Sequence, residues 1–184
     1  MTRTIYVCIC AVLLTASSWI VGCHKPPSVS VDTQANTETA RDGAKYLLST
    51  EPADAKGVID VRKDVKDADA VVVVGRIGGS KEPFVKGRTA FTIVDQSLAA
   101  CSDVEGDNCE TPWDYCCVRK EDLARASVAI KIVDGQGKTL THDAKDFLGI
   151  EPLQTVVVQG RAKRDADGNL TVLAEGIYIR AKPR

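Results

Sequence analysis

The stretch TVVVQGRAKRDADGNLTVLAEGIYI, residues 155–179, decides the fold of this chain. Its two ends, 155–163 and 170–179, are rich in β-branched and apolar residues, which favour strands. Between them lies DADGN, a group of typical turn residues, so the pattern predicts a long β-hairpin. A glycine inside each strand, Gly160 and Gly176, indicates a bulge or a sharp bend, which a small sheet needs when it curls closed.

Three more strand patterns and one helical pattern precede the hairpin. Strands are expected at 70–77, 89–94 and 127–133, and one or two helical turns at 143–148. The first strand begins with a run of valines, which is typical of a strand buried on both faces, whereas the next two alternate apolar and polar residues. The folded region is therefore predicted to be mainly β.

The order of these elements resembles the OB-fold, a small five-stranded, partly open Greek-key barrel. Strand, strand, long insertion, strand, short helix and hairpin follow one another, and VGR (74–76) and VQGR (158–161) add to the likeness. The resemblance implies one barrel domain, 55–184, with a cysteine-containing loop inserted between the second and third strands. The formal net charge of −1 argues against a general binder of polyanions.

The N-terminal segment, 1–22, has the pattern of a secretory signal peptide. Arg3 precedes an apolar run, 5–14, which is short for a membrane-spanning helix, and small residues follow before Gly22 and Cys23. This pattern resembles the bacterial lipobox. The resemblance implies cleavage before Cys23 and attachment of lipid to it, which would hold the protein on the cell membrane or outer membrane, facing the periplasm. An ordinary signal peptide followed by a chance cysteine is the alternative.

The segment that follows, 23–54, is rich in Pro, Ser, Thr, Asn and Asp, and predicts a flexible linker. A linker of about 30 residues has a root-mean-square reach on the order of 30 Å. One apolar group, YLL at 46–48, predicts a short helical turn packed on the domain. The whole chain is also similar to a group of planctomycete-type lipoproteins, through GRIGG (75–79), PWDYCC (112–117) and EGIY (175–178), a similarity that implies no activity.

The chain has seven cysteines, of which Cys8 and Cys10 lie in the signal peptide and Cys23 at the lipobox. The four that remain are Cys101, Cys109, Cys116 and Cys117. An even number of cysteines in an exported chain predicts two disulfide bonds, with all three connectivities open. Such bonds would stabilise this long acidic loop by roughly 2–4 kcal/mol.

A metal site is the main alternative, because four thiolates can form a tetrahedral zinc site and also suit Cu(I). Against it, Cys116 and Cys117 are adjacent, which does not match the two-residue spacing of familiar zinc modules. Thiol-redox exchange by this pair is a third interpretation, without a Cys-x-x-Cys motif or a neighbouring base to support it. No cofactor is expected apart from Zn or Cu in the metal-binding alternative.

The same loop contains Trp113, Asp114 and Tyr115, which are candidates for a ligand-binding edge. The favoured interpretation is that the two aromatic residues cover the cysteines and seal the loop onto the barrel. The sequence contains no Ser-His-Asp or Cys-His arrangement, and its basic residues lack aromatic neighbours for stacking on bases. We therefore predict a non-enzymatic, membrane-anchored barrel that binds an unidentified protein or small ligand and no nucleic acid, with metal binding or thiol-redox activity through the cysteine loop as the alternative.

Overall fold

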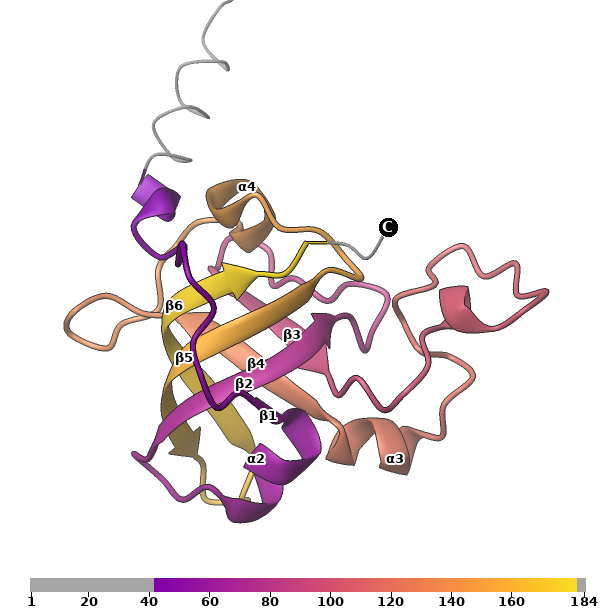
Figure 1. The fold of residues 1–184 in the computed structure, drawn as a ribbon, viewed down its shortest axis with the longest axis horizontal. Coiled ribbons are helices and arrows are strands. Elements are labelled where there is room, and N and C mark those ends of the chain that lie inside the picture. Colours follow the sequence, from indigo (N-terminus) through magenta and orange to yellow (C-terminus); the bar gives the residue numbers. More distant parts are fainter. Residues whose placement is uncertain (1–41, 182–184) are drawn as a thin grey trace, which may run out of the picture. The chain divides into compact units, whose positions relative to one another are not determined.

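A computed structural model of the chain describes residues 42–181, which build a closed five-stranded β-barrel with one extra strand (Figure 1). The predicted signal peptide, Cys23 and the linker up to residue 41 lie outside the described residues. Within 42–181, no helix has the length and apolar character that crossing a membrane requires.

The barrel strands agree with the predicted ones to within one residue at each end. They are β2 (Ala70–Ile77), β3 (Ala90–Val94), β4 (Ser127–Ile132), β5 (Thr155–Arg164) and β6 (Leu170–Ile179). The extra strand is β1 (Lys56–Gly57), and the helices are α2 (Val58–Asp64), α3 (Lys120–Arg125), α4 (Ala144–Leu148) and the 3-10 helix η1 (Cys101–Asp103).

The barrel closes because β2 pairs with strands on both of its sides. β2 is antiparallel to β3 and to β5, β3 is antiparallel to β4, and β5 is antiparallel to β6. The circle is completed by a parallel pairing of β4 with β6, and α4 lies in the connection from β4 to β5. The predicted OB-fold-like Greek-key barrel is thus confirmed, with its insertion between β3 and β4.

The inward faces of the strands form one apolar core. Val73, Phe91, Ile130, Val158 and Ile177 come from five different strands, and each is at most 1% exposed. On β5 the buried residues alternate with exposed ones after Val158, as expected for a strand with one face on the core. The barrel is therefore a packed support and not a channel.

The hairpin of β5 and β6 carries the predicted bulge. Gln159 pairs with Gly176 but Gly160 pairs with Ala174, which leaves Glu175 as the extra residue on β6. A Cβ on Gly160 would lie 2.1 Å from the carbonyl oxygen of Leu173. Only glycine allows the two strands to approach so closely at this position.

We expect Gly160→Ala to lower the free energy of unfolding by about 1–3 kcal/mol, because the added methyl group must push the β6 backbone away. Urea unfolding measures the change. Gly135→Ala is the matched control, since nothing lies within 4 Å of a Cβ built there, and it should change stability by less than about 0.5 kcal/mol. Equal effects of the two substitutions would contradict this account of the bulge.

The end of the predicted linker, 42–54, lies against the barrel. Tyr46 is buried, its carbonyl oxygen accepts the Ile177 N–H at 2.7 Å, and Leu48 donates its N–H to the Ile177 carbonyl at 2.8 Å. Glu51 forms an ion pair with Arg180 at 2.6 Å. The predicted packing of residues 46–48 on the domain is therefore observed, and the chain is held on the barrel before residue 55. The predicted helical turn there is wrong, because Leu47 forms a parallel β-bridge with Ile177 and the helical residues are 42–44.

Candidate metal centre

The insertion between β3 and β4, residues 95–126, carries all four cysteines of the described chain and lies to one side of the barrel (Figure 1). Several contacts attach it to the barrel. Trp113 supplies two of them. Its carbonyl oxygen accepts the Gly79 N–H at 2.8 Å, and its indole Nε1–H donates to the Lys81 carbonyl at 3.0 Å. Both contacts lie just after β2, so the loop is tied to the end of a barrel strand.

An ion pair makes a second attachment. Arg76 of β2 contacts the Asp103 carboxylate at the end of η1, and this carboxylate also accepts the Ala100 N–H at 3.0 Å. The Arg76 guanidinium is the main reason that the pKa of Asp103 is held below its usual value. Close by, Cys101 donates its backbone N–H to the Pro112 carbonyl at 3.0 Å, which ties the start of the cysteine segment, 101–117, to its second half.

Tyr115 is the apolar anchor of the loop. It is 1% exposed and packs with Val94 and Ala100, and a Cβ on Gly78 would lie 2.9 Å from its ring. Its φ of 58° is in the left-handed region, which costs a non-glycine residue free energy that this packing offsets. Burial is the main cause that raises its pKa, and the nearby Arg76 guanidinium opposes this rise. The guanidinium is not placed for a hydrogen bond, so the Tyr115 hydroxyl has no hydrogen-bond partner in the described chain. Tyr115 is therefore not available at the surface as part of a binding edge.

We expect Tyr115→Phe to leave stability unchanged or slightly higher, because it removes a buried polar group that makes no hydrogen bond. Metal binding should also be unchanged, since the aromatic ring and not the hydroxyl holds the loop. Urea unfolding and metal titration measure the two quantities. A loss of binding in this variant would place the hydroxyl in the site and contradict the anchoring role.

The sulfur atoms of the four cysteines lie close to one another. The Cys116 Sγ is 3.4 Å from that of Cys101, 3.8 Å from that of Cys109 and 4.0 Å from that of Cys117. A disulfide bond requires about 2.0 Å, and all four cysteines are free. The predicted disulfide bonds are thus not observed, although the structure does bring the predicted residues together.

Two aspartates complete the cluster, and each lies in a separate turn of the same type. Asp107 accepts the N–H of Cys109 at 2.8 Å, and Asp114 accepts the N–H of Cys116 at 2.9 Å. A side-chain oxygen that accepts the backbone N–H two residues later forms an Asx turn, so each Asp-x-Cys sequence fixes its carboxylate against the backbone of its own cysteine. Thr111 holds the other Asp114 oxygen through a hydrogen bond of 3.0 Å.

The Asp114 carboxylate also approaches two of the sulfur atoms. Its Oδ1 lies 3.6 Å from the Sγ of Cys101 and 3.9 Å from that of Cys109. Burial by itself would raise the pKa of Asp114, but hydrogen bonds from the Cys116 N–H and from Thr111 outweigh it and lower the pKa. The carboxylate is therefore a charged oxygen ligand at the side of three thiols.

The size of this group fits a metal ion. One ligand atom from each of Cys101, Cys109, Asp114 and Cys116 lies within 4.8 Å of the others. Zn–S bonds of about 2.3 Å in a tetrahedron imply separations of about 3.8 Å between sulfur atoms. The distance from the Cys116 Sγ to that of Cys109, 3.8 Å, matches this value, and the distance to that of Cys101, 3.4 Å, is somewhat shorter, so an ion would fit with small side-chain shifts.

The charges around the four cysteines favour a bound cation over a reactive thiolate. Residues 101–117 contain five carboxylates and no lysine or arginine. Burial raises the pKa of Cys101, and the neighbouring thiols of Cys101 and Cys109 raise the pKa of Cys116. Reactive redox cysteines have lowered pKa values next to positive charge, which these thiols lack among the described contacts.

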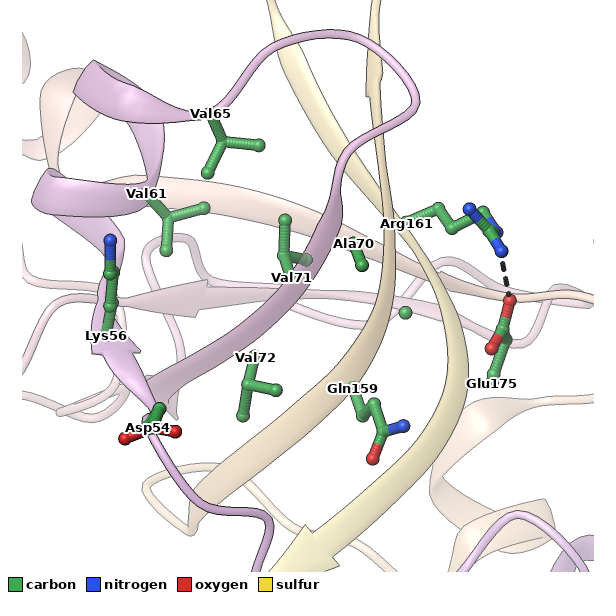
Figure 2. A pocket seen from close by; sticks show the side chains of 11 residues that line it. Asp54, Lys56, Val61, Val65, Ala70, Val71, Val72, Gln159, Arg161 and Glu175 are labelled. Atoms are coloured by element: carbon green, nitrogen blue, oxygen red, sulfur yellow. Dashed lines mark ion pairs between the residues drawn. The ribbon is translucent and has the colours of Figure 1, made fainter.

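A second candidate is an open groove of about 450 Å³ over β2 and β5 (Figure 2). Val61 and Val71 contribute apolar surface, and Arg161 and Glu175 form an ion pair of 3.6 Å at its edge. The charged groups that line the groove do not converge on one point. It offers a surface to a ligand, but no arrangement of groups with a defined chemistry.

Comparison with known protein families and with curated proteins finds no match to this chain. The function must therefore be argued from the site. Sequence reasoning found all four thiols but singled out Asp114 only as part of a binding edge and missed Asp107. The repeated Asp-x-Cys spacing was the signal that would have revealed both carboxylates.

Proposed function

We propose that this protein is a non-enzymatic, membrane-anchored zinc-binding protein whose site is the cysteine loop. The observation that supports this most directly is the group of three sulfur atoms and one carboxylate oxygen, all within 4.8 Å of one another. Cys101, Cys109, Cys116 and Asp114 would be the four ligands. This proposal is compatible with a barrel that also binds a protein or small ligand, because the loop leaves the groove over β2 and β5 free.

Zinc fits this ligand set better than copper. Thiolates suit both Zn²⁺ and Cu⁺, but a carboxylate is a hard ligand that Cu⁺ does not favour. Asp114 is held in place by Thr111 and by the Cys116 N–H, so its oxygen is pre-organised for an ion. Its participation is the feature that distinguishes the two metals.

The test is metal retention by the full chain. The protein would be purified from membranes in detergent, reduced, incubated with excess Zn²⁺ or Cu⁺, desalted and weighed by native mass spectrometry. We expect bound zinc in the wild type, and weaker zinc binding in Asp114→Asn. Copper bound equally well by the wild type and Asp114→Asn, with zinc not retained, would overturn the choice of zinc.

A variant with serine at positions 101, 109, 116 and 117 provides the blank, because any metal that it retains comes from elsewhere in the chain, including the N-terminal cysteines. Alkylation of thiols before and after reduction, read on the same spectra, reports disulfide bonds. Two disulfide bonds before reduction, together with no metal retained after reduction and incubation with zinc, would mean that the cysteines only stabilise the loop and would refute the proposal.

Membrane attachment through Cys23 and a periplasmic location are proposals of their own, supported by the lipobox-like sequence at the end of 1–22. One acyl chain alone gives only marginal binding, so several chains on Cys23 would be needed for stable attachment. Labelling cells with a palmitate analogue should mark the wild type and not Cys23→Ser. An unlabelled wild-type band would rule out lipidation.

A further inference from the structure

Six of the cysteine and aspartate side chains of the loop form two overlapping sets of potential metal ligands. The first set is Cys101, Cys109, Asp114 and Cys116, and the second is Cys101, Asp107 and Cys117. Within each set the ligand atoms lie within 4.8 Å of one another. We infer that the loop binds two Zn²⁺ ions that share the Cys101 thiolate. This inference rests on the proposed function, because it extends the same cysteine centre.

The two adjacent cysteines contribute to different sets. The Cys116 Sγ approaches Cys101 and Cys109, at 3.4 Å and 3.8 Å. The Cys117 Sγ instead lies 3.9 Å from the Asp107 Oδ2. Although the two sulfur atoms are 4.0 Å apart, Cys117 groups with Cys101 and Asp107 and not with Cys109 and Asp114, so two neighbouring ions would use both cysteines.

The position of Cys101 allows its thiolate to bridge the two zinc ions. A thiolate sulfur has more than one lone pair, so it can bind two ions at once. Cys101 is buried at 1% exposure, and its backbone is fixed by the hydrogen bond to Pro112. Cys101 is the one residue that belongs to both sets, so its sulfur atom lies within 4.8 Å of the ligand atoms of each.

The charge of the cluster favours a second ion. Four thiolates and two carboxylates together carry six negative charges when all are ionised. A single Zn²⁺ cancels two of these charges, and a second cancels two more. Like charges at separations of about 4 Å repel strongly wherever water is partly excluded, so the second ion relieves repulsion that the first leaves.

The two ions would differ in how readily they exchange. The first set offers four protein ligands, which is the number of a closed structural zinc site. The second set offers three, which leaves one position for water or for a ligand from outside, such as a thiolate or carboxylate. Cys117 is exposed and Asp107 is half-buried, so solvent reaches the second ion.

The number of zinc ions per chain tests this inference. Full-length protein, reduced and reconstituted with Zn²⁺ as above, would be weighed by native mass spectrometry during titration with a zinc chelator. We expect two ions in the wild type, with one removed at lower chelator concentration. Cys117→Ser and Asp107→Asn should each bind one ion, held as tightly as the tighter ion of the wild type.

Glu105→Gln is the matched control, because Glu105 is an exposed carboxylate of the same loop that belongs to neither set, and it should bind two ions. A wild type that binds only one ion overturns the inference, whether or not Cys117→Ser loses it, and leaves the proposed function standing. A wild type that binds none refutes both. Two ions that persist in Cys117→Ser and in Asp107→Asn would place the second site elsewhere.

Discussion

Cys116→Ser should remove the tightly bound zinc ion, with a fall in affinity of more than about 100-fold. Replacing a residue that only hydrogen-bonds to a metal ligand typically lowers metal affinity 10–100-fold. Cys116 would itself be a ligand at the centre of the site, so its loss should cost more. Its Sγ lies within 4.0 Å of all three other sulfur atoms. Serine keeps the size of the side chain but is a much poorer ligand for zinc, so the change tests chemistry and not packing.

The measurement is competition with a zinc chelator, together with thermal unfolding with and without zinc. Zinc at 100 times its dissociation constant should stabilise the wild type by about 2.7 kcal/mol and Cys116→Ser by much less. Glu110→Gln is the control, since this carboxylate is exposed, lies in the same loop and belongs to neither ligand set. Wild-type affinity in Cys116→Ser would remove Cys116 from the site.

Phe91→Ala should lower the free energy of unfolding by about 3–5 kcal/mol, a large part of the 5–15 kcal/mol that is typical of folded proteins. Phe91 is 1% exposed at the centre of the barrel, where it pairs across the sheet with Ile130. Its ring also packs against Phe84, with 6.1 Å between centroids. Removing the ring leaves a cavity that the closed sheet cannot fill by moving a single strand.

Urea unfolding measures this loss, and Phe91→Leu should give an intermediate value if the alanine variant fails to fold. Val85→Ala is the control, because Val85 precedes β3 and is 52% exposed, so its truncation should change stability by less than about 0.5 kcal/mol. A Phe91→Ala variant as stable as the wild type would show that the core does not depend on this ring.

The barrel was predictable because its strands carry local signals. The valine run of β2, the alternation of β3 and β4 and the turn residues between β5 and β6 each specify an element from neighbouring residues alone. Gly160 was correctly assigned to a bulge. Gly176 proved to have a second role, since a Cβ there would lie 2.9 Å from the side chain of Leu48, from a segment expected to be linker.

Four elements of the described chain, β1, α2, η1 and α3, were not predicted, and α2 shows why. Its sequence, VIDVRKD, contains β-branched residues that favour helices only weakly. The helix begins where Ile59 donates its N–H to the Asp95 carboxylate, at 3.0 Å and 36 positions away. A Cβ on Gly57 would lie 2.7 Å from that carboxylate, so the glycine that precedes the helix is part of the same contact.

The sequence by itself determined the strands, their order, the hairpin and the identity of the four thiols, because each depends on residues that are neighbours in the chain. Only the tertiary structure decided whether those thiols form disulfide bonds or lie together as a cluster of free thiols. Arg76, Gly78 and Gly79 of the barrel hold the loop that brings Cys101 to Cys116 and Asp114. Contacts of this kind join residues far apart in the chain and leave no periodic pattern, so the sequence identified the four thiols and only the fold showed that two aspartates join them.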